Sequence, residues 1–570
     1  MASGKTAVVN NKRCVACGAS AAARIRRLDE TAQIIVLERS NYVSYANCGL
    51  PYFIGGVIRE QAELTLQTPQ SFWERFHIDV RVRNEAVDID VKSKTVAIRR
   101  LDTGEIYHEQ YDKLLLSPGA KPVVPHLPGV TSDRIFSLRT VEDTLRIRKF
   151  IEEYKPATAV LVGGGFIGLE MAENLTAMGI SVTVIQRSNQ LFAPMDADMA
   201  SFIHAQMRSH GVKLELEKTV TGFSSKGGKP VTMIKDSEPI SSDMVLLGVG
   251  VEPDTVLAEK AGLALGIRGA VAVNEYMETS VPDIYAVGDA VEVSHFVTGK
   301  KSLISLAGPA NKQGRIAADN ICGGNSMFKG TQGSSVIKIF EMTGAVTGIN
   351  EKTAEAAGIV YDKVVLSPVS HAAYYPGGQT MYMKVLYEKE TLRLLGAQIA
   401  GYEGVDKRID VLAAAIRAGM TADKLAELEL AYAPPYSSAK DPVNMAGFMI
   451  ENLETEKVAQ FHWNEVEKLK CDGSMTLIDV RTAEEFDSGH IKGFFNIPVD
   501  ELREHIEEFD VKNPVYVVCQ SGLRSYIACC ILSQYGFECY NLSGGYGFYS
   551  TVMHEKQMAK SAYPCGMEKC

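Results

Sequence analysis

Residues 158–186 restrict the possible folds of this chain more strongly than any other segment. The segment has the order strand, turn, helix and strand, over Ala159–Val162, Gly163–Gly168, Leu169–Met178 and Val182–Ile185. Gly163, Gly165 and Gly168 match the G-x-G-x-x-G pattern, in which missing side chains let backbone N–H groups approach a pyrophosphate at a helix N-terminus. The segment therefore predicts a nucleotide-binding βαβ unit.

The end of the second strand in this unit bears on the choice of nucleotide. The strand runs into Gln186 and Arg187 rather than into an acidic residue. A carboxylate at this place holds a ribose 2′-hydroxyl, whereas an arginine accommodates a 2′-phosphate. The sequence leaves both NADH and NADPH open.

The first forty residues repeat the strand–helix–strand order with an altered turn. Glu38 ends the second strand about twenty positions after the turn, where it would hold a ribose hydroxyl. Of the three turn glycines only Gly18 remains, and Arg13 restricts the backbone where the turn is tightest. Cys14 and Cys17 form a C-x-x-C pair, but no second pair or histidine follows at zinc-like spacing. The segment predicts a βαβ unit, but its turn taken alone does not match a dinucleotide site, and a redox or metal role of the cysteine pair is disfavoured.

Cys48 lies in a polar loop between Asn47 and Gly49. Buried structural cysteines usually lie among aliphatic and aromatic neighbours. A loop gives a thiolate the access and the nearby donors that its chemistry requires. We therefore expect Cys48 to be reactive; the alternative is a small apolar residue in a loop.

Residues 279–290 contain an apolar strand that ends in Gly288-Asp289-Ala290. A helix-forming segment, Gly308–Asn320, follows. A carboxylate at a strand end beside a helix N-terminus suits the ribityl hydroxyls of a flavin, while the alternative is an ordinary turn aspartate.

Residues 331–450 change in character, because strand-like runs come first and helical runs follow, as in an α+β domain. Two groups of tyrosines lie in its polar loops: Tyr374 with Tyr375, and Tyr432 with Tyr436. The charged residues 451–465 are consistent with a linker.

The last part of the chain has two buried strands of the parallel type, and the second of them, Val515–Val518, enters a loop that begins at Cys519. The backbone N–H groups of such a loop, the following helix and Arg524 would stabilise a thiolate. Cys529 and Cys530 are better explained by core packing.

Composition limits the remaining possibilities. A chain of 570 residues is too long for a single core and predicts three or four domains. A net charge of −10 argues against general nucleic-acid binding, and no apolar run is long enough to span a membrane. Eleven irregularly spaced cysteines, and an N-terminus without the order of a signal peptide, favour a reducing cytoplasm.

Together these segments resemble a known family. Residues 1–450 are similar to the pyridine nucleotide–disulfide oxidoreductases with one active-site cysteine, and in particular to the coenzyme A disulfide reductases. The matching segments are Ser44–Tyr52, Gly163–Glu170, Ala286–Ala290 and the tyrosine loops. Residues 465–555 resemble a rhodanese domain through Ile478–Arg481, Glu485-Phe486, Gly489–Ile491, Asn496–Pro498 and the Cys519 loop. The combination resembles the NAD(P)H-dependent persulfide and polysulfide reductases.

The resemblance implies an α/β fold class with two Rossmann-like dinucleotide-binding domains, an α+β dimerisation domain and a C-terminal α/β rhodanese domain. The expected boundaries are 1–155 with 276–330 for FAD, 156–275 for NAD(P)H, 331–450 for dimerisation, 451–465 for a linker, 466–556 for rhodanese and 557–570 for a tail that contains Cys565 and Cys570.

The resemblance also implies FAD, NADH or NADPH, coenzyme A, and a homodimer whose tyrosines reach the partner's active site. The residues implied for FAD and the nucleotide are Gly18, Glu38, Arg39, Gly163, Gly165, Gly168, Gly288 and Asp289. Those implied for coenzyme A are Ser20, Arg24, Arg27, Ser44 and Asn47. Those implied for catalysis are Cys48, Cys519, Tyr374, Tyr375, Tyr432, Tyr436 and Arg524. The family has glycine where this chain has Arg13, Cys14 and Cys17.

The expected activity is NAD(P)H-dependent reduction of coenzyme A persulfide, polysulfide or coenzyme A disulfide through Cys48, with sulfane sulfur delivered by Cys519. One alternative is an NAD(P)H oxidase or peroxidase that cycles Cys48 through a sulfenic acid, but such an enzyme needs no rhodanese domain. Another is a non-enzymatic redox or sulfur sensor, which the altered turn at Arg13 would favour.

Overall fold

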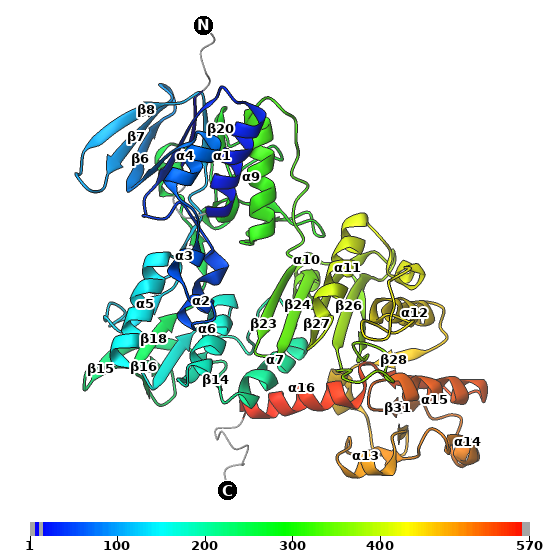
Figure 1. The fold of residues 1–570 in the computed structure, drawn as a ribbon. Helices are drawn as coiled ribbons and strands as arrows, with labels where there is room; N and C mark the ends of the chain where they lie inside the picture. The colour runs from blue at the N-terminus through cyan, green and yellow to red at the C-terminus, as the bar shows by residue number, and fades with distance from the viewer. Residues whose placement is uncertain (1–5, 11–14, 561–570) are drawn as a thin grey trace. The chain divides into compact units, whose positions relative to one another are not determined.

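The computed structural model describes residues 6–10 and 15–560 (Figure 1). The chain divides into two compact units, Met1–Ser188 with Gly211–Gly333, and Asn189–His210 with Ser334–Cys570. Arg13, Cys14, Cys565 and Cys570 lie outside the described residues, as does the side chain of Cys17.

The first unit contains a five-stranded parallel sheet of order β20-β9-β1-β2-β5. Its strands are Ile284–Ala286, Lys113–Leu116, Thr6–Asn10, Gln33–Glu38 and Asp79–Val82. Strand β2 is buried from its second residue onward, because helices and loops cover both faces of a parallel sheet. Helices α1 (Val15–Leu28) and α9 (Ala307–Ile321) pack side by side (Figure 1).

A second parallel sheet in this unit has the order β11-β18-β12-β13-β14. Its strands are Ile135–Ser137, Met244–Leu247, Thr158–Val162, Ser181–Ile185 and Lys213–Glu215. Helix α6 (Phe166–Ala177) connects β12 to β13 across the glycine turn, and α5 (Val141–Tyr154) precedes β12. The two sheets give the first unit two βαβ nucleotide-binding frameworks.

Shorter elements complete the first unit. Two antiparallel sheets contain β6 (Asn84–Asp90), β7 (Thr95–Arg100) and β8 (Ile106–Gln110), and β15 (Val220–Lys226), β16 (Lys229–Ile234) and β17 (Ile240–Ser241). The strand pairs are β3 (Ser44–Tyr45) with β4 (Thr65–Gln67), β10 (Ala120–Pro122) with β19 (Val251–Pro253), and β21 (Val293–Ser294) with β22 (Lys301–Ser302). The short helices are α2 (Leu50–Ile54), α3 (Gln61–Leu64), α4 (Pro69–Phe76) and α8 (Val256–Lys260), with 3₁₀ turns at Asn47–Gly49, Ile267–Gly269 and Gly288–Ala290.

The second unit contains an antiparallel sheet of order β23-β24-β27-β26-β25. Its strands are Ser335–Ile339, Met342–Gly348, Leu394–Gly401, Tyr382–Glu388 and Tyr361–Leu366. The helices of this part are α7 (Ala197–Ser209), α10 (Glu351–Ala357), α11 (Val405–Ala418) and α12 (Pro442–Glu454), with a 3₁₀ helix at Ala422–Glu427. The sheet is the α+β framework that the sequence predicts for residues 331–450.

The place of α7 differs from the predicted domain boundaries, which put residues 156–275 in one nucleotide-binding domain. Residues 189–210 instead belong to the second unit. The physical reason is aromatic packing, because Phe202 stacks on Tyr382 of β26 with ring centroids 3.9 Å apart and also contacts Phe548.

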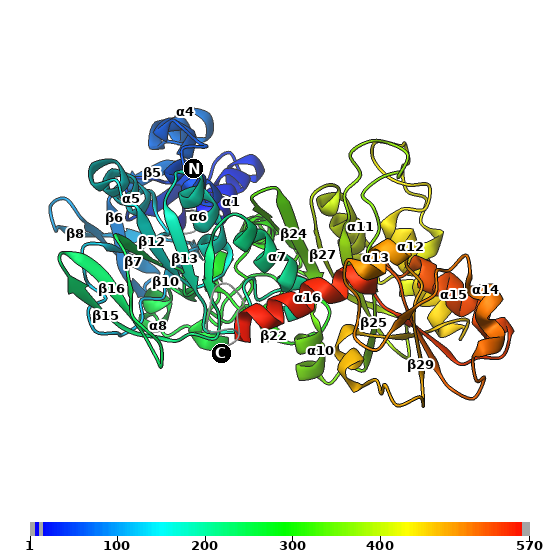
Figure 2. The same ribbon diagram turned by 90° about the horizontal axis from the view of Figure 1, so that it is seen from below.

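The C-terminal part of the second unit is a parallel sheet of order β28-β32-β31-β29-β30. Its strands are Ala459–Phe461, Cys539–Leu542, Val515–Val518, Thr476–Asp479 and Phe495–Asn496. The helices are α13 (Ala483–Asp487), α14 (Leu502–His505), α15 (Leu523–Gln534) and α16 (Gly545–Lys560), with 3₁₀ helices at Trp463–Lys468 and Ile506–Glu508. Figure 2 shows α16 running from this sheet along α7. Helix α12 and strand β28 both extend into the segment 451–465, for which the sequence predicts a linker.

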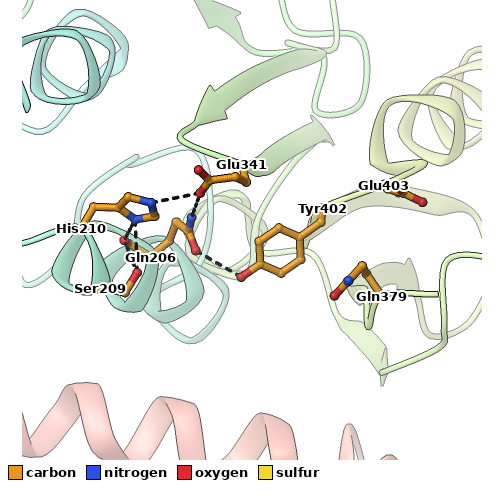
Figure 3. Close-up of a pocket in the computed structure, with 7 residues that line it drawn as sticks. All are labelled: Gln206, Ser209, His210, Glu341, Gln379, Tyr402 and Glu403. Atoms are coloured by element: carbon orange, nitrogen blue, oxygen red, sulfur yellow. Dashed lines mark hydrogen bonds and ion pairs between the residues drawn. The ribbon is translucent and has the colours of Figure 1, made fainter. Parts of the chain in front are cut away.

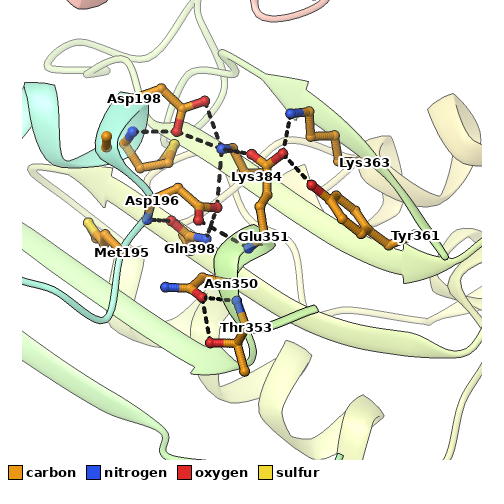
Figure 4. Close-up of polar contacts among 12 residues, drawn as sticks. Met195, Asp196, Asp198, Asn350, Glu351, Thr353, Tyr361, Lys363, Lys384 and Gln398 are labelled. Atoms are coloured by element: carbon orange, nitrogen blue, oxygen red, sulfur yellow. Dashed lines mark hydrogen bonds and ion pairs between the residues drawn. The ribbon is translucent and has the colours of Figure 1, made fainter. Parts of the chain in front are cut away.

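A buried network of charges connects three parts of the second unit (Figure 4). Lys384 is 0% exposed, and its Nζ lies 2.6 Å from an oxygen of Asp198, 2.6 Å from Glu351 and 3.3 Å from Asp196. Trp463 donates its indole N–H to Asp198 across 3.0 Å. Burial alone would raise the pKa of Glu351, but the neighbouring lysines lower it to about 2. The ammonium of Lys384 lies among the three carboxylates, where a cation would bind.

None of the helices formed by residues 15–560 combines the length and apolar character that a membrane crossing requires.

Candidate active sites

Cys48 lies in the 3₁₀ turn Asn47–Gly49, immediately before α2, and its side chain is exposed. The turn is held against the chain by the Ala46 N–H, which donates to the Leu64 carbonyl across 2.8 Å. Partial burial raises the pKa of the Cys48 thiol, and Glu170 raises it further, whereas Arg139 opposes the shift. The thiol form of Cys48 therefore predominates at neutral pH.

Glu170 is a residue of α6 that the sequence motif contains but to which it assigns no role. Burial and then Glu173 raise the pKa of Glu170 to about 7. The same carboxylate acts on Tyr52, whose pKa burial and Glu170 raise to about 12. Helix α2 packs closely on α6, because a Cβ at Gly55 would lie 2.1 Å from Asn174 Oδ1. The active-site turn therefore rests on the helix that carries a carboxyl group titrating near neutral pH.

Asp289 lies where the sequence predicts it, between β20 and α9. Arg139 donates from its guanidinium to Asp289 Oδ2 across 2.7 Å, and both side chains are largely buried. The preceding Gly288 donates its N–H to Gln313 Oε1 across 2.7 Å. Sequence reasoning missed Arg139, because its partner lies 150 positions further along the chain.

Glu38 ends β2 and is 2% exposed. Its carboxylate accepts the Ser40 N–H across 2.6 Å, and burial raises its pKa to about 8. A buried carboxyl group with one backbone donor keeps acceptor capacity for the vicinal hydroxyls of a ribose. Gly18 is buried in α1, and Arg39 lies 3.7 Å from Glu85. The carboxyl group of Glu38 suits a ribose, and binding of a flavin dinucleotide by Gly18, Glu38 and Arg39 stays a prediction.

The three glycines of the second turn differ in what surrounds them. A Cβ at Gly168 would lie 2.1 Å from the Gly163 carbonyl oxygen, and Gly163 has a φ of +109° that favours glycine. A Cβ at Gly165 would meet no heavy atom within 4 Å. Gln186 accepts the Gly164 N–H across 3.1 Å, and Arg187 is exposed. Two glycines thus serve packing, and Gly165 leaves the open space that a pyrophosphate requires.

The residues predicted to hold coenzyme A lie in two groups. Ser20 donates its hydroxyl to Asn311 across 3.0 Å, and Arg24 pairs with Asp319 at 2.8 Å, so both face α9. Arg27 is exposed on α1. Ser44 is buried in β3 and Asn47 is exposed in the Cys48 turn. Their binding of coenzyme A stays a prediction.

The structure brings the two predicted tyrosine groups together. The hydroxyls of Tyr374 and Tyr432 lie 2.7 Å apart, and this contact raises the pKa of Tyr432. Tyr374 is 75% exposed and Tyr436 72% exposed, while Tyr375 packs edge-on against His371. Large exposed phenols at loop tips are available to a partner.

Cys519 is buried at the end of β31. Gly522 donates its N–H to Cys519 Sγ across 3.1 Å, and the Ser525 hydroxyl lies 3.2 Å from the same sulfur. Gly522 has a φ of +96°, a left-handed backbone conformation that favours glycine. A negative charge on Cys519 would therefore be stabilised by the loop and by the N-terminus of α15.

The hydrogen bonds to Glu485 raise the pKa of Arg524, and an electrostatic interaction with Cys519 adds to the shift, so the role of Arg524 at Cys519 stays a prediction. Its guanidinium donates two hydrogen bonds of 2.7 Å to the two oxygens of Glu485. In the described part of the chain the hydrogen bonds to Cys519 Sγ come from Gly522 and Ser525, and none comes from Arg524. Cys529 is buried in the core as expected, and Cys530 is partly exposed.

A polar cavity of about 590 Å³ lies apart from all predicted site residues (Figure 3). Its lining residues are Gln206, Ser209, His210, Glu341, Gln379, Tyr402 and Glu403. Glu341 accepts a hydrogen bond from Gln206 across 3.0 Å and lies 3.0 Å from His210 Nε2. The polar groups of the lining largely satisfy one another.

Three segments of the chain match known protein families. Residues 16–314, more than half of the chain, match the family model described as pyridine nucleotide-disulphide oxidoreductase. The chain belongs to the pyridine nucleotide-disulphide oxidoreductase family. Residues 334–442 match the dimerisation domain of this family, and residues 462–550 match a rhodanese-like domain. The fold class predicted from the sequence is thereby confirmed.

Members of this family that act on coenzyme A disulfide are similar to the chain over most of their length. Coenzyme A disulfide reductase of Staphylococcus haemolyticus (strain JCSC1435) is 38% identical over 440 residues, which are 77% of this chain and 98% of that protein. The enzyme of the same name from Staphylococcus aureus (strain bovine RF122 / ET3-1) is 37% identical over 435 residues, covering 76% of this chain and 97% of that protein.

Two solved structures of family members include the rhodanese part. Reduced Bacillus anthracis CoADR-RHD is 46% identical, with a TM-score of 0.94, and covers 97% of this chain and 99% of its own. The NAD-dependent persulfide reductase from A. fulgidus is 38% identical, with a TM-score of 0.89, and covers 96% of this chain and 100% of its own.

Proposed function

We propose that the protein is an FAD-dependent enzyme that uses NADH or NADPH to reduce coenzyme A disulfide or coenzyme A persulfide through Cys48. Its rhodanese domain carries sulfane sulfur on Cys519. The observation that carries this proposal is the presence of two thiol sites in one chain, one beside two dinucleotide frameworks and one in a loop of backbone donors.

The residues that surround the dinucleotide frameworks fit both cofactors. Glu38 offers its carboxylate to ribose hydroxyls, and Gly165 leaves room for a pyrophosphate. The ion pair of Arg139 and Asp289 holds a carboxylate at the end of β20, where ribityl hydroxyls would bind. When bound, the flavin supplies the two electrons, received from NAD(P)H as hydride, that reduce a disulfide at Cys48.

Cys48 acts on sulfur as a thiolate. Attack on the inner sulfur of coenzyme A persulfide forms a Cys48–coenzyme A disulfide and releases the outer sulfur as hydrosulfide. With coenzyme A disulfide, the same attack releases one coenzyme A thiolate. Arg139 favours the thiolate of Cys48, whereas the ionised carboxylate of Glu170 disfavours it.

The tyrosine pair supplies protons to the departing thiolate. A phenol has an ordinary pKa of about 10 and remains protonated at neutral pH. The contact between Tyr374 and Tyr432 lets one hydroxyl donate to the leaving group while the other reprotonates it. In the proposed homodimer these tyrosines serve the Cys48 of the partner subunit.

The alternatives that the sequence leaves open receive less support. An NAD(P)H oxidase or peroxidase would not use the contacts that Gly522 and Ser525 make to Cys519. A sensor without a flavin would have no use for the buried carboxyl group of Glu38.

Replacement of the two thiols separately tests the proposal. Cys48→Ser should lower reduction of coenzyme A disulfide and persulfide by roughly a thousandfold or more, because it removes the nucleophile. Flavin bleaching by NAD(P)H, followed by stopped flow, should persist because hydride transfer does not involve the thiol. Cys519→Ser is the matched control and should retain reduction of coenzyme A disulfide. Loss of flavin bleaching in Cys48→Ser, or full activity in that variant, would contradict the proposal.

A further inference from the structure

Two arginines of the rhodanese domain, Arg481 after β29 and Arg524 in α15, are both paired with carboxylates. Arg481 is 1% exposed, pairs with Asp479 at 2.7 Å, and lies over the ring of Tyr546 with its guanidinium carbon 3.9 Å from the centroid. Arg524 is held by both oxygens of Glu485. Each ion pair contains one positive and one negative charge, so the two pairs add no net charge near Cys519.

The ion pair of Glu485 and Arg524 is held in place by a further contact of Glu485. Glu485 also forms a capping box with Thr482, accepting the Thr482 N–H across 2.9 Å, so its side chain is fixed at the start of α13. The hydrogen bonds from Arg524 lower the pKa of Glu485 to about 2, so the carboxylate is ionised at all ordinary pH values. Bidentate pairs of this kind are the stronger class of ion pair.

The remaining side chains of the loop carry no charge. Gln520, Ser521 and Leu523 are exposed around the end of the loop, and Leu523 is 55% exposed. A donor that reaches Cys519 therefore meets backbone N–H groups and uncharged side chains of the loop, and the charged group that interacts with Cys519 is Arg524, already paired with Glu485.

Sulfur donors differ in the charge that their leaving group carries. When the Cys519 thiolate attacks the outer sulfur of a persulfide R–S–SH, the donor S–S bond breaks and a new S–S bond forms on Cys519. The electron pair leaves with R–S⁻, and the proton stays on the transferred sulfur. With thiosulfate the same attack expels sulfite, which leaves with two negative charges and needs a cation beside it.

We propose, on the basis of the function proposed above, that the Glu485–Arg524 pair makes the Cys519 site selective for persulfide donors over thiosulfate. Glu485 is a specificity-determining residue that acts through Arg524. It accepts the hydrogen bonds that Arg524 would otherwise donate to the sulfonate group of thiosulfate, and its own negative charge repels that group. Thiol persulfides avoid this penalty because their transferred end is a small S–H group and the sulfur atom that leaves carries a single negative charge.

Sulfur transfer to cyanide in the full-length FAD-loaded protein tests this inference, with thiocyanate as the measured product. NAD(P)H is omitted, so that the chemistry of Cys48 is idle. Glutathione persulfide and thiosulfate are the two donors. Arg524 is paired with Glu485 and does not donate a hydrogen bond to thiosulfate. In the native protein, kcat/KM for thiosulfate should therefore be lower than kcat/KM for glutathione persulfide by about tenfold or more.

Glu485→Gln should raise kcat/KM for thiosulfate by about tenfold or more, because Arg524 is released to bind the sulfonate. The gain should lie in KM and fall with added salt, while use of the persulfide changes little. Glutamine also serves in a capping box, so α13 keeps its start. The double variant Glu485→Gln/Arg524→Gln should lose the gain.

Glu484→Gln is the matched control, because Glu484 is exposed one position earlier and has no ion-pair partner among the described residues. This substitution removes the same charge and should leave kcat/KM for both donors unchanged. The inference is overturned if the native protein uses both donors equally, or if Glu485→Gln remains active with the persulfide and gains nothing with thiosulfate. If the native protein transfers sulfur from neither donor, the carrier role in the proposed function fails instead. Equal use of the two donors by the native protein would overturn the inference even if a variant does not fold.

Discussion

Glu170 gives the Cys48 turn a neighbour whose charge changes in the working pH range. Its pKa of about 7 means that it is protonated below neutral pH and ionised above it. The ionised form raises the pKa of Cys48, and the protonated form does not. As pH rises, Glu170 therefore acquires the charge that disfavours the Cys48 thiolate, so ionisation of the cysteine is shifted to higher pH.

Replacing Glu170 by glutamine should lower the pKa of Cys48, because it fixes the side chain in an uncharged form. The pH at which Cys48 reacts half-maximally with iodoacetamide should fall by about 0.5 to 1 unit. The reaction is followed at the Cys48 peptide by mass spectrometry, so the other cysteines do not interfere. Glu173→Gln should move the curve less, since Glu173 acts on Glu170 rather than on Cys48. An upward shift in Glu170→Gln would refute this coupling.

In the turn between β12 and α6, two glycines of the same sequence pattern have different roles, one in packing and one toward a ligand. Gly168 serves packing, because a side chain there would meet the backbone of Gly163. The space beside Gly165 is open, and we expect the nucleotide to occupy it. The φ of Gly165, −84°, is one that any residue can adopt.

Two alanine substitutions at this turn should therefore fail in different ways. Gly168→Ala should lower the free energy of unfolding by about 1–3 kcal/mol through overpacking. Gly165→Ala should fold normally but bind NAD(P)H more weakly, because the added methyl group occupies the space for the pyrophosphate. Thermal unfolding and NADH titration of the two variants distinguish these effects. Equal loss of stability in both would show that Gly165 is also a packing residue.

An element can be predicted from the sequence when the residues that stabilise it lie close together along the chain. The strand–turn–helix–strand order around Gly163 is confirmed, since each glycine has a local reason to be there. The position of α7 could not be predicted, because Asp198 meets Lys384 only 186 residues later. For the same reason Arg524 appears in the sequence as a free cation, whereas Glu485 lies 39 positions earlier.

At the scale of the whole molecule, the match to the family's dimerisation domain supports the proposed homodimer, in which the two tyrosine loops would belong to an active unit of two chains. Tyr374 and Tyr436 are among the most exposed large side chains described, although exposed tyrosines on a monomer have no evident advantage. In the proposed dimer they are proton donors for the partner's Cys48.

Mixed dimers test this arrangement. Cys48→Ser, and a chain with phenylalanine at all four tyrosine positions (Tyr374, Tyr375, Tyr432 and Tyr436), should each be inactive alone, since loss of a general acid costs roughly a hundredfold or more. Co-expression should restore partial activity, because one site of the mixed dimer combines an intact cysteine with intact tyrosines. Isolated mixed dimers that show no recovery would place both groups in one subunit.

The ion pairs of Lys384 also bear on how the chain is made. Asp198 leaves the ribosome 186 residues before its buried partner Lys384 and 265 residues before its second partner, the partly buried Trp463. At about 5–20 residues per second, helix α7 waits roughly ten to forty seconds for Lys384 and longer for Trp463. During that interval its apolar face, including Phe202 and Met207, has no sheet to cover. Nascent chains of this protein should therefore depend on a holding chaperone until the last third of the sequence has emerged.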